Sequence, residues 1–191
     1  MRLTLWKRFS YALSLTILVA FAAAYTATVH ARDVRIVQLR DDCDQATFDA
    51  AVGPGTCVGD GDTLFADFLA EFDAQGSVDE WRFNPDNSEA DRGVQALNRG
   101  GETHTFTEVA HFGGGFIPRL NGGATPLTEC ARRDANGNTI PGPGGTLVPA
   151  AAAIASLVPA GETGPTKVLA KGTHRFQCCI HPWMQSTIKI E

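Results

Sequence analysis

The stretch RFQCCIHPWM, Arg175 to Met184, places two cysteines, a histidine and a methionine within seven positions. Three interpretations are open from these letters alone: a metal site, a redox-active pair of thiols, or two disulfide halves beside an ordinary histidine. Cys178, His181 and Met184 are spaced three positions apart, so a tight loop at the end of a strand can direct all three side chains to one centre. A thiolate, an imidazole and a thioether form a soft donor set that suits copper.

A copper site of this type needs a second histidine from elsewhere in the chain. Two histidines and one cysteine in a plane, with a long axial methionine, form a blue-copper electron-transfer site. After the first 31 residues the chain has 5 − 1 = 4 histidines. His104, in GGETHTFTEV, stands where a Gly-rich turn leads into a strand and is the candidate ligand. His111 lies roughly 20 Å further along that strand, and His174 lies roughly 13 Å before Cys178, so we expect structural or surface roles for both.

The segments around these residues resemble the cupredoxin family of small blue copper proteins. The resemblance is carried by CxxHPWM in the final strand–loop–strand, by HTFT at His104, and by FNP and GTHRFQC ahead of the two ligand segments. The short ligand loop is most similar to that of amicyanin-like members and related plastocyanin and azurin types. The resemblance covers residues 81–107 and 167–191. It implies that His104, Cys178, His181 and Met184 ligate one copper ion, Cu+ or Cu2+, as the cofactor.

Three features depart from the family pattern. The separation of His104 from Cys178, 178 − 104 = 74 residues, exceeds that of the smallest members, which a Gly/Pro-rich insertion would explain. Many members carry an asparagine beside the first histidine that hydrogen-bonds towards the ligand loop, whereas Thr103 and Thr105 flank His104 here. Support and tuning of the ligands therefore differ. Cys179, directly beside the expected ligand, is also unusual.

The sequence has five cysteines, an odd number. Adjacent residues of a strand point to opposite sides, and only Cys178 has the family spacing to the loop histidine, so Cys178 is the expected ligand. This leaves 5 − 1 = 4 cysteines for disulfides. Cys43 with Cys57 would close a modest loop, and Cys130 is the unclaimed candidate for Cys179, although connectivity cannot be read from sequence. A vicinal disulfide of Cys178 with Cys179 is the alternative; it would need strained geometry and leaves the loop spacing unexplained.

The first 31 residues have the plan of a secretory signal peptide. MRLTLWKRFS carries three basic residues, and an uncharged, mostly apolar run follows it as far as Ala31, where we expect cleavage. An uncleaved membrane anchor is the alternative, because the run approaches the ~20 residues that span a bilayer. Either way we expect a periplasmic or extracellular protein. Cleavage changes the net charge from −5 to −5 − 3 = −8, and such an acidic chain excludes nucleic acid as a partner.

Residues 32–191 are expected to form one domain. Strand patterns occur over 34–40, 81–85, 103–112, 166–178 (broken near Gly172) and 186–191. Residues 62–76 have apolar residues at helical spacing, with Asp62 or Thr63 as the cap and Gly76 at the end. Segment 113–165 is rich in Gly and Pro and indicates a long inserted loop with a helical turn between Pro149 and Pro159.

These elements predict an all-β fold, an antiparallel Greek-key β-sandwich of cupredoxin type with an N-terminal helical decoration. The expected function is one-electron transfer, with an apolar rim at Pro182 and Trp183 where a redox partner protein docks close to His181. We expect a monomer, with no membrane association in the mature form. Copper storage or delivery, or a cupredoxin-fold binding module without redox turnover, are the alternatives. We do not expect an enzyme, because a copper oxidase would need further histidine-bound coppers.

Overall fold

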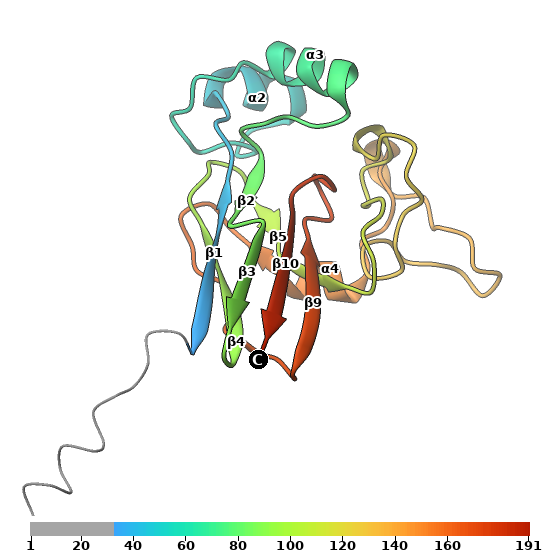
Figure 1. Ribbon diagram of the computed structural model, residues 1–191. Helices are drawn as coiled ribbons and strands as arrows, with labels where there is room; N and C mark the ends of the chain where they lie inside the picture. The colour runs from blue at the N-terminus through green and yellow to red at the C-terminus, as the bar shows by residue number, and fades with distance from the viewer. Residues whose placement is uncertain (1–32) are drawn as a thin grey trace, which may run out of the picture. The chain divides into compact units, whose positions relative to one another are not determined.

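A computed structural model describes residues 33–191. Two four-stranded sheets and a two-stranded ladder make up the β structure of this part (Figure 1). The predicted signal peptide, residues 1–31, lies outside the described residues. Among the helices of residues 33–191, none is long and apolar enough to cross a membrane.

The first sheet has the strand order β2-β1-β4-β8. Its strands are β1 (Val34–Arg40), β2 (Arg82–Asn84), β4 (Gly93–Asn98) and β8 (Lys167–Val168). β1 has the predicted bounds, and its alternation turns Val37 and Leu39 into the core. β8 falls within the predicted strand pattern 166–178, ahead of its expected break near Gly172, whereas β4 was not predicted.

The second sheet has the order β3-β10-β9-β6. Its strands are β3 (Asn87–Ala90), β6 (Thr107–Val109), β9 (Gly172–Gln177) and β10 (Gln185–Ile190). The predicted histidine strand is divided at Phe106, so that His104 lies in a separate ladder. That ladder pairs β5 (His104–Thr105) with β7 (Leu157–Val158).

Two helices follow β1 in the chain, α2 (Gln45–Val52) and α3 (Phe65–Gln75). α3 was predicted, and Gly76 ends it in the left-handed conformation, with φ of 75°. The expected cap at Asp62 or Thr63 is wrong, because the Thr63 hydroxyl bonds to Asp42 instead. α2 was not predicted, although Asp44 caps it by accepting from the amide of Thr47 at 2.8 Å. The sequence pattern did not indicate this helix because it is short and because Gly and Pro directly follow it.

The expectation of a purely antiparallel sandwich is wrong in two places. β1 pairs in parallel with β4, and β10 pairs in parallel with β3. Parallel neighbours need a long crossover connection, and the chain between β1 and β4 supplies one by passing through α2, α3, β2 and β3. Local alternation cannot reveal this, because it reports which face of a strand is buried and not the direction of its neighbour. The Greek-key connection stays a prediction.

Segment 113–165 is held against the second sheet. It contains two 3-10 turns, η1 (Pro118–Leu120) and η2 (Pro143–Gly145), and a short helix, α4 (Ala151–Ala155), where a helical turn was expected. Its Cys130 belongs to a small buried cluster that also contains Val109 of β6 and Cys179, two residues after the end of β9. The segment is therefore anchored to the sandwich despite its glycine content.

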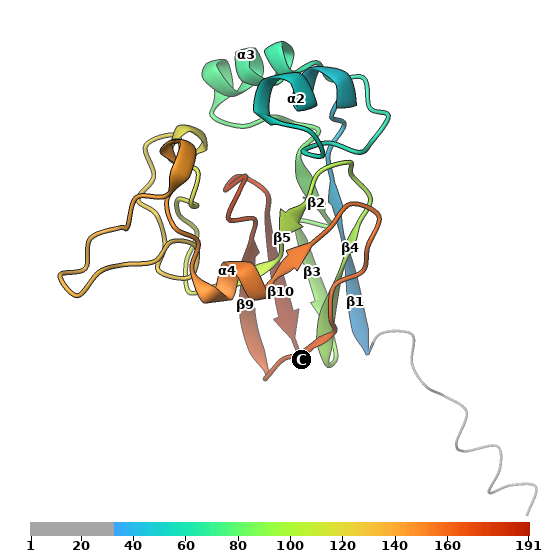
Figure 2. The same ribbon diagram turned by 180° about the vertical axis from the view of Figure 1, so that it is seen from behind.

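The main core lies between the two sheets and continues beneath the helices. Phe106 stacks on Phe176 with ring centroids 4.3 Å apart. Beneath α2 and α3, the Trp81 ring lies 5.8 Å from Phe48 and 4.8 Å from Phe68. This packing attaches the helices to the end of the sandwich where the loop between β9 and β10 emerges (Figures 1 and 2).

Candidate metal centre

The loop between β9 and β10 holds three of the four predicted ligands in one tight turn. The Cys178 amide donates to the Met184 carbonyl at 3.0 Å, and the Met184 amide donates to the His181 carbonyl at 3.0 Å. These bonds close the loop on itself. Cys178, His181 and Met184 are 0%, 3% and 0% exposed, and Met184 belongs to the same buried cluster as Cys178. A thioether in such apolar surroundings suits a weak axial ligand, and this role of Met184 stays a prediction.

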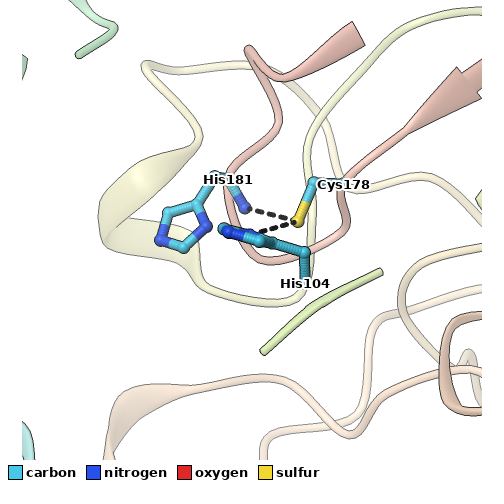
Figure 3. A group of neighbouring side chains, drawn as sticks. All are labelled: His104, Cys178 and His181. Atoms are coloured by element: carbon cyan, nitrogen blue, oxygen red, sulfur yellow. Dashed lines mark hydrogen bonds between the residues drawn. The ribbon is translucent and has the colours of Figure 1, made fainter. Parts of the chain in front are cut away.

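His104 reaches this loop from β5. Its Nδ1 lies 3.9 Å from the Sγ atom of Cys178, and ligand atoms of His104, Cys178 and His181 all lie within 4.8 Å of one another. Figure 3 shows the two imidazoles and the sulfur converging from the strand and the loop. His181 Nδ1 is buried without a hydrogen-bond partner in the described part of the chain. Such an atom costs about 1–3 kcal/mol, a cost that a bound metal ion would remove. The donor set therefore fits copper.

The thiol of Cys178 is prepared for ionisation. It is the free cysteine of residues 33–191, and the amides of Thr105 and His181 each donate to its sulfur at 3.5 Å. Burial opposes ionisation, but the neighbouring His104 and His181 side chains outweigh burial and hold the pKa of Cys178 well below its usual range. Because a metal binds the thiolate and not the thiol, this environment favours the metal-binding form.

Asp41, which directly follows β1, fixes the orientation of His104. Asp41 Oδ2 lies 2.7 Å from His104 Nε2, and both side chains are fully buried. Burial lowers the pKa of His104, but hydrogen bonds with Asp41 and Cys178 raise it to about 10. In the metal-free protein these shifts favour the thiolate of Cys178 and the protonated form of His104. The carboxylate retains the proton on Nε2 and so leaves Nδ1, which faces Cys178, as the nitrogen for a metal.

Glu102 takes the corresponding place beside His181. Its Oε2 atom lies 3.6 Å from His181 Nε2 and accepts from the indole of Trp81 at 2.5 Å. Burial raises the pKa of Glu102 against the opposing effects of His181 and His104. Sequence reasoning missed both carboxylates, because neither belongs to a motif and Asp41 lies 63 positions from His104. The one sequence feature that could have pointed to Glu102 is its position two residues before His104.

Thr105 connects the histidine strand to the ligand loop. The Cys179 amide donates to Thr105 Oγ1 at 2.7 Å, and the Thr107 hydroxyl donates to the same oxygen at 3.0 Å. Thr105 is fully buried. A threonine hydroxyl therefore makes the connection for which many cupredoxins use an asparagine, which accounts for one departure noted in the sequence.

The two adjacent cysteines have separate surroundings. Disulfides join Cys43 to Cys57 and Cys130 to Cys179, the pairs expected from the sequence. Cys178 packs in the main core, whereas Cys179 packs in the small cluster beneath segment 113–165. The vicinal alternative does not occur, and the two thiols do not form one redox pair.

The remaining histidines lie away from the cluster, as expected. His111 is exposed. His174 Nδ1 lies 2.6 Å from Glu108 Oε1, and its Nε2 lies 2.8 Å from the Ala170 carbonyl oxygen. His174 therefore connects β9 with β6 and with the turn before β9.

The apolar rim expected at Pro182 and Trp183 is largely covered. Pro182 is buried and Trp183 is half-buried. From α3, the rings of Phe68 and Phe72 lie 6.2 and 5.1 Å from that of Trp183, and the His181 ring lies 5.4 Å from it. The reason is the α2–α3 helical pair, which covers this side of the loop. Docking at Pro182 and Trp183 stays a prediction.

No protein-family model matches the sequence, and no curated protein matches it. Among solved structures, a purple cupredoxin from Nitrosopumilus maritimus matches with a TM-score of 0.36 and 12% identity, over 82% of this chain and 99% of that one. Two amicyanin variants also match. One, in the Cu(I) form, has a TM-score of 0.31 and 13% identity, over 58% of this chain and 73% of that one. The other, in the reduced state, has a TM-score of 0.32 and 14% identity, over 61% and 84%. All three come from the family that the sequence motifs resemble. These TM-scores are low, so we base the functional proposal on the site's own residues.

Proposed function

We propose that this protein is a cupredoxin-like electron carrier that binds one copper ion through His104, Cys178, His181 and Met184. Copper supplies a centre that accepts and releases single electrons as it cycles between Cu+ and Cu2+. The observation that carries the proposal is the convergence of two imidazoles and a free thiol within 4.8 Å of one another, in a fully buried place. One of these nitrogens, His181 Nδ1, has no other partner in residues 33–191.

The surroundings of the ligands favour electron transfer over storage or delivery. Asp41 holds His104, Thr105 holds the start of the loop, and the Cys130–Cys179 disulfide fixes the neighbouring backbone. Donor groups held this firmly change little between oxidation states, whereas a delivery protein must open to release its metal. The methionines are Met1 and Met184, too few for a methionine-rich carrier.

We also propose that the protein is exported, monomeric, and reduced or oxidised by a partner protein. The two disulfides support an oxidising compartment, periplasmic or extracellular. Trp183 supports a docking position near the loop, because its half-buried ring contacts His181 and reaches towards the surface. No further histidine lies with the three-residue cluster among the described residues, which supports a carrier more than a multicopper enzyme.

A visible absorption and EPR spectrum of the copper-loaded protein tests the proposal. We expect an intense thiolate-to-copper charge-transfer band, and we expect it to disappear in Cys178→Ala. The matched control is His111→Ala, an exposed histidine outside the cluster, which should keep the full band. A colourless Cu(II) form, or full colour in Cys178→Ala, would contradict the assignment.

Electrochemistry separates electron transfer from storage. We expect the bound copper to cycle reversibly on an electrode and to resist removal by a chelator, because its ligands are buried. Ready exchange with a chelator without reversible cycling would instead favour storage or delivery.

A further inference from the structure

A cavity of about 240 Å³ lies beside the loop between β9 and β10 that carries the proposed copper ligands. It lies between the α2–α3 pair and the η1 turn. Most of its wall is apolar and is formed by Phe48, Phe65, Phe68, Leu69, Ile117 and Ile180. Glu102 and His181 also line it. The cavity thus extends from the surface of the helical pair to a proposed copper ligand.

Several apolar side chains of this wall are incompletely buried. Phe65, Leu69, Ile117 and Ile180 are half-buried, although Phe48 and Phe68 beside them are only 1% and 3% exposed. The structure therefore leaves apolar surface accessible at a concave site. An apolar ligand of suitable size would remove that surface from water, which is the main source of affinity in small-molecule pockets.

The charged groups of the cavity select the kind of ligand. Glu102 is about nine-tenths buried, and its Oε2 atom is engaged by Trp81. Within residues 33–191 no hydrogen bond involves its other oxygen, Oε1, which can accept one from a ligand. Arg119 lines the cavity from η1, and its guanidinium pairs with Asp73 of α3 at 2.5 Å. The Arg119–Asp73 pair contributes no net charge to the cavity. Glu102 disfavours an anionic ligand, and the apolar wall disfavours a cation because removing an ion from water is costly, so a neutral ligand with a hydrogen-bond donor fits best.

We infer that this cavity binds a small neutral phenol, with its ring among Phe48, Phe65 and Phe68 and its hydroxyl donating to Glu102. A cavity of about 150 Å³ accommodates benzene, so 240 Å³ leaves room for a substituted ring. Aromatic rings pack favourably against one another edge to face or offset, and three phenylalanines supply such surfaces. A phenol in this position also lies beside His181, which lines the same cavity. This site goes beyond the proposed electron carrier, which needs no small-molecule ligand.

The test uses the purified metal-free protein, so its outcome does not depend on copper binding. 4-Methylphenol is titrated and followed by two-dimensional NMR. We expect saturable shifts at Leu69 and Ile180, which line the cavity. Toluene, which lacks the hydroxyl, should bind at least ten-fold more weakly, because a tenfold difference corresponds to about 1.4 kcal/mol, the scale of one hydrogen bond. 4-Methylbenzylamine, a cation, should also bind more weakly than the phenol.

A matched pair of variants locates the site. Leu69→Trp fills the cavity from α3 and should weaken 4-methylphenol binding more than ten-fold. Leu64→Trp, at a residue that is 44% exposed before the same helix and outside the cavity lining, should bind like the unmodified protein. Absence of saturable binding, full binding by Leu69→Trp, or equal affinity for toluene would overturn the inference. Tighter binding of 4-methylbenzylamine would overturn the assignment to a neutral ligand. If Leu69→Trp fails to fold, the three-ligand comparison on the unmodified protein decides.

Discussion

Replacement of Asp41 by asparagine tests whether a buried carboxylate sets the proton position of His104, a proposed copper ligand. Oδ2 of Asp41 accepts from His104 Nε2 at 2.7 Å and from the Glu102 amide at 3.1 Å. Oδ1 accepts from the Gly101 amide at 2.8 Å. In Asp41→Asn the carbonyl oxygen can keep the Gly101 bond, and the new NH2 group then faces two donors. The backbone around the site is otherwise unchanged.

The structure indicates the size of the effect. The Glu102 amide loses its acceptor, which costs about 1–3 kcal/mol for a buried group, and a charge-assisted bond of about 1.5–3 kcal/mol to His104 is lost. His104 can recover part of this by giving up its Nε2 proton and accepting from the new NH2 group. We therefore expect the metal-free protein to lose about 3 kcal/mol of unfolding free energy. The pKa of His104, raised to about 10 in the unmodified protein, should fall.

The same change should weaken metal binding. The recovered bond leaves the remaining proton on Nδ1, the nitrogen that faces Cys178 and that a metal needs. Loss of such a supporting group typically reduces metal affinity 10- to 100-fold. Zn2+ is a suitable probe because it undergoes no redox reaction with the thiol. We expect a reduction in this range when Zn2+ affinity is measured by competition with a chelator.

Asp42→Asn is the matched control. Asp42 stands next in the chain, but its Oδ2 accepts from the Thr63 hydroxyl at 3.1 Å and does not face His104. This variant should keep the Zn2+ affinity and the titration of His104. If Asp41→Asn also keeps both, with the pKa of His104 still near 10 by NMR, then Asp41 does not set the proton position and the reasoning is refuted.

Three further predictions concern the surroundings of the site. Thr105→Val removes the acceptor of the buried Cys179 amide, so chemical denaturation should show a loss of about 1–3 kcal/mol. Replacement of both Cys130 and Cys179 by alanine opens a cross-link spanning 49 residues, and the loop-entropy relation sets the loss of stability at about 4 kcal/mol. A hydrogen bond with Glu108 raises the pKa of His174, so Glu108→Gln should destabilise the protein most near pH 5.5, with the difference lost as pH rises above about 6.5 and through the raised pKa.

Each of these predictions has an outcome that contradicts it. Thr103→Val, on the exposed flank of His104, should leave stability unchanged, and an equal loss there would show that the Thr105 hydroxyl has no special role. An unchanged denaturation midpoint in the double alanine variant would mean that segment 113–165 is held by packing alone. A stability difference in Glu108→Gln that grows with rising pH would have the wrong sign for a proton bound more tightly in the folded state.

The sequence alone determined the local features of the loop between β9 and β10. Cys178, His181 and Met184 lie within one short segment, so their spacing predicts their convergence without knowledge of the rest of the chain. The separate surroundings of Cys178 and Cys179 were predicted from strand alternation, which is also local, although β9 ends one residue before Cys178. β1 and α3 were predicted for the same reason. The apolar residues of each recur with the period of its own secondary structure, and they define a buried face within the element itself.

The tertiary structure decided what surrounds that loop. Asp41 reaches His104 only because β1 ends beside β5, and the parallel pairing of β1 with β4 depends on a crossover that no local pattern encodes. The cover over His181 and the cavity beside it arise where α2, α3 and η1 meet. Contacts of this kind join residues far apart in the chain, and they depend on how whole elements pack. Spacing and periodicity could therefore name the candidate ligands, while the groups that orient, bury and give access to them became visible only in the folded chain.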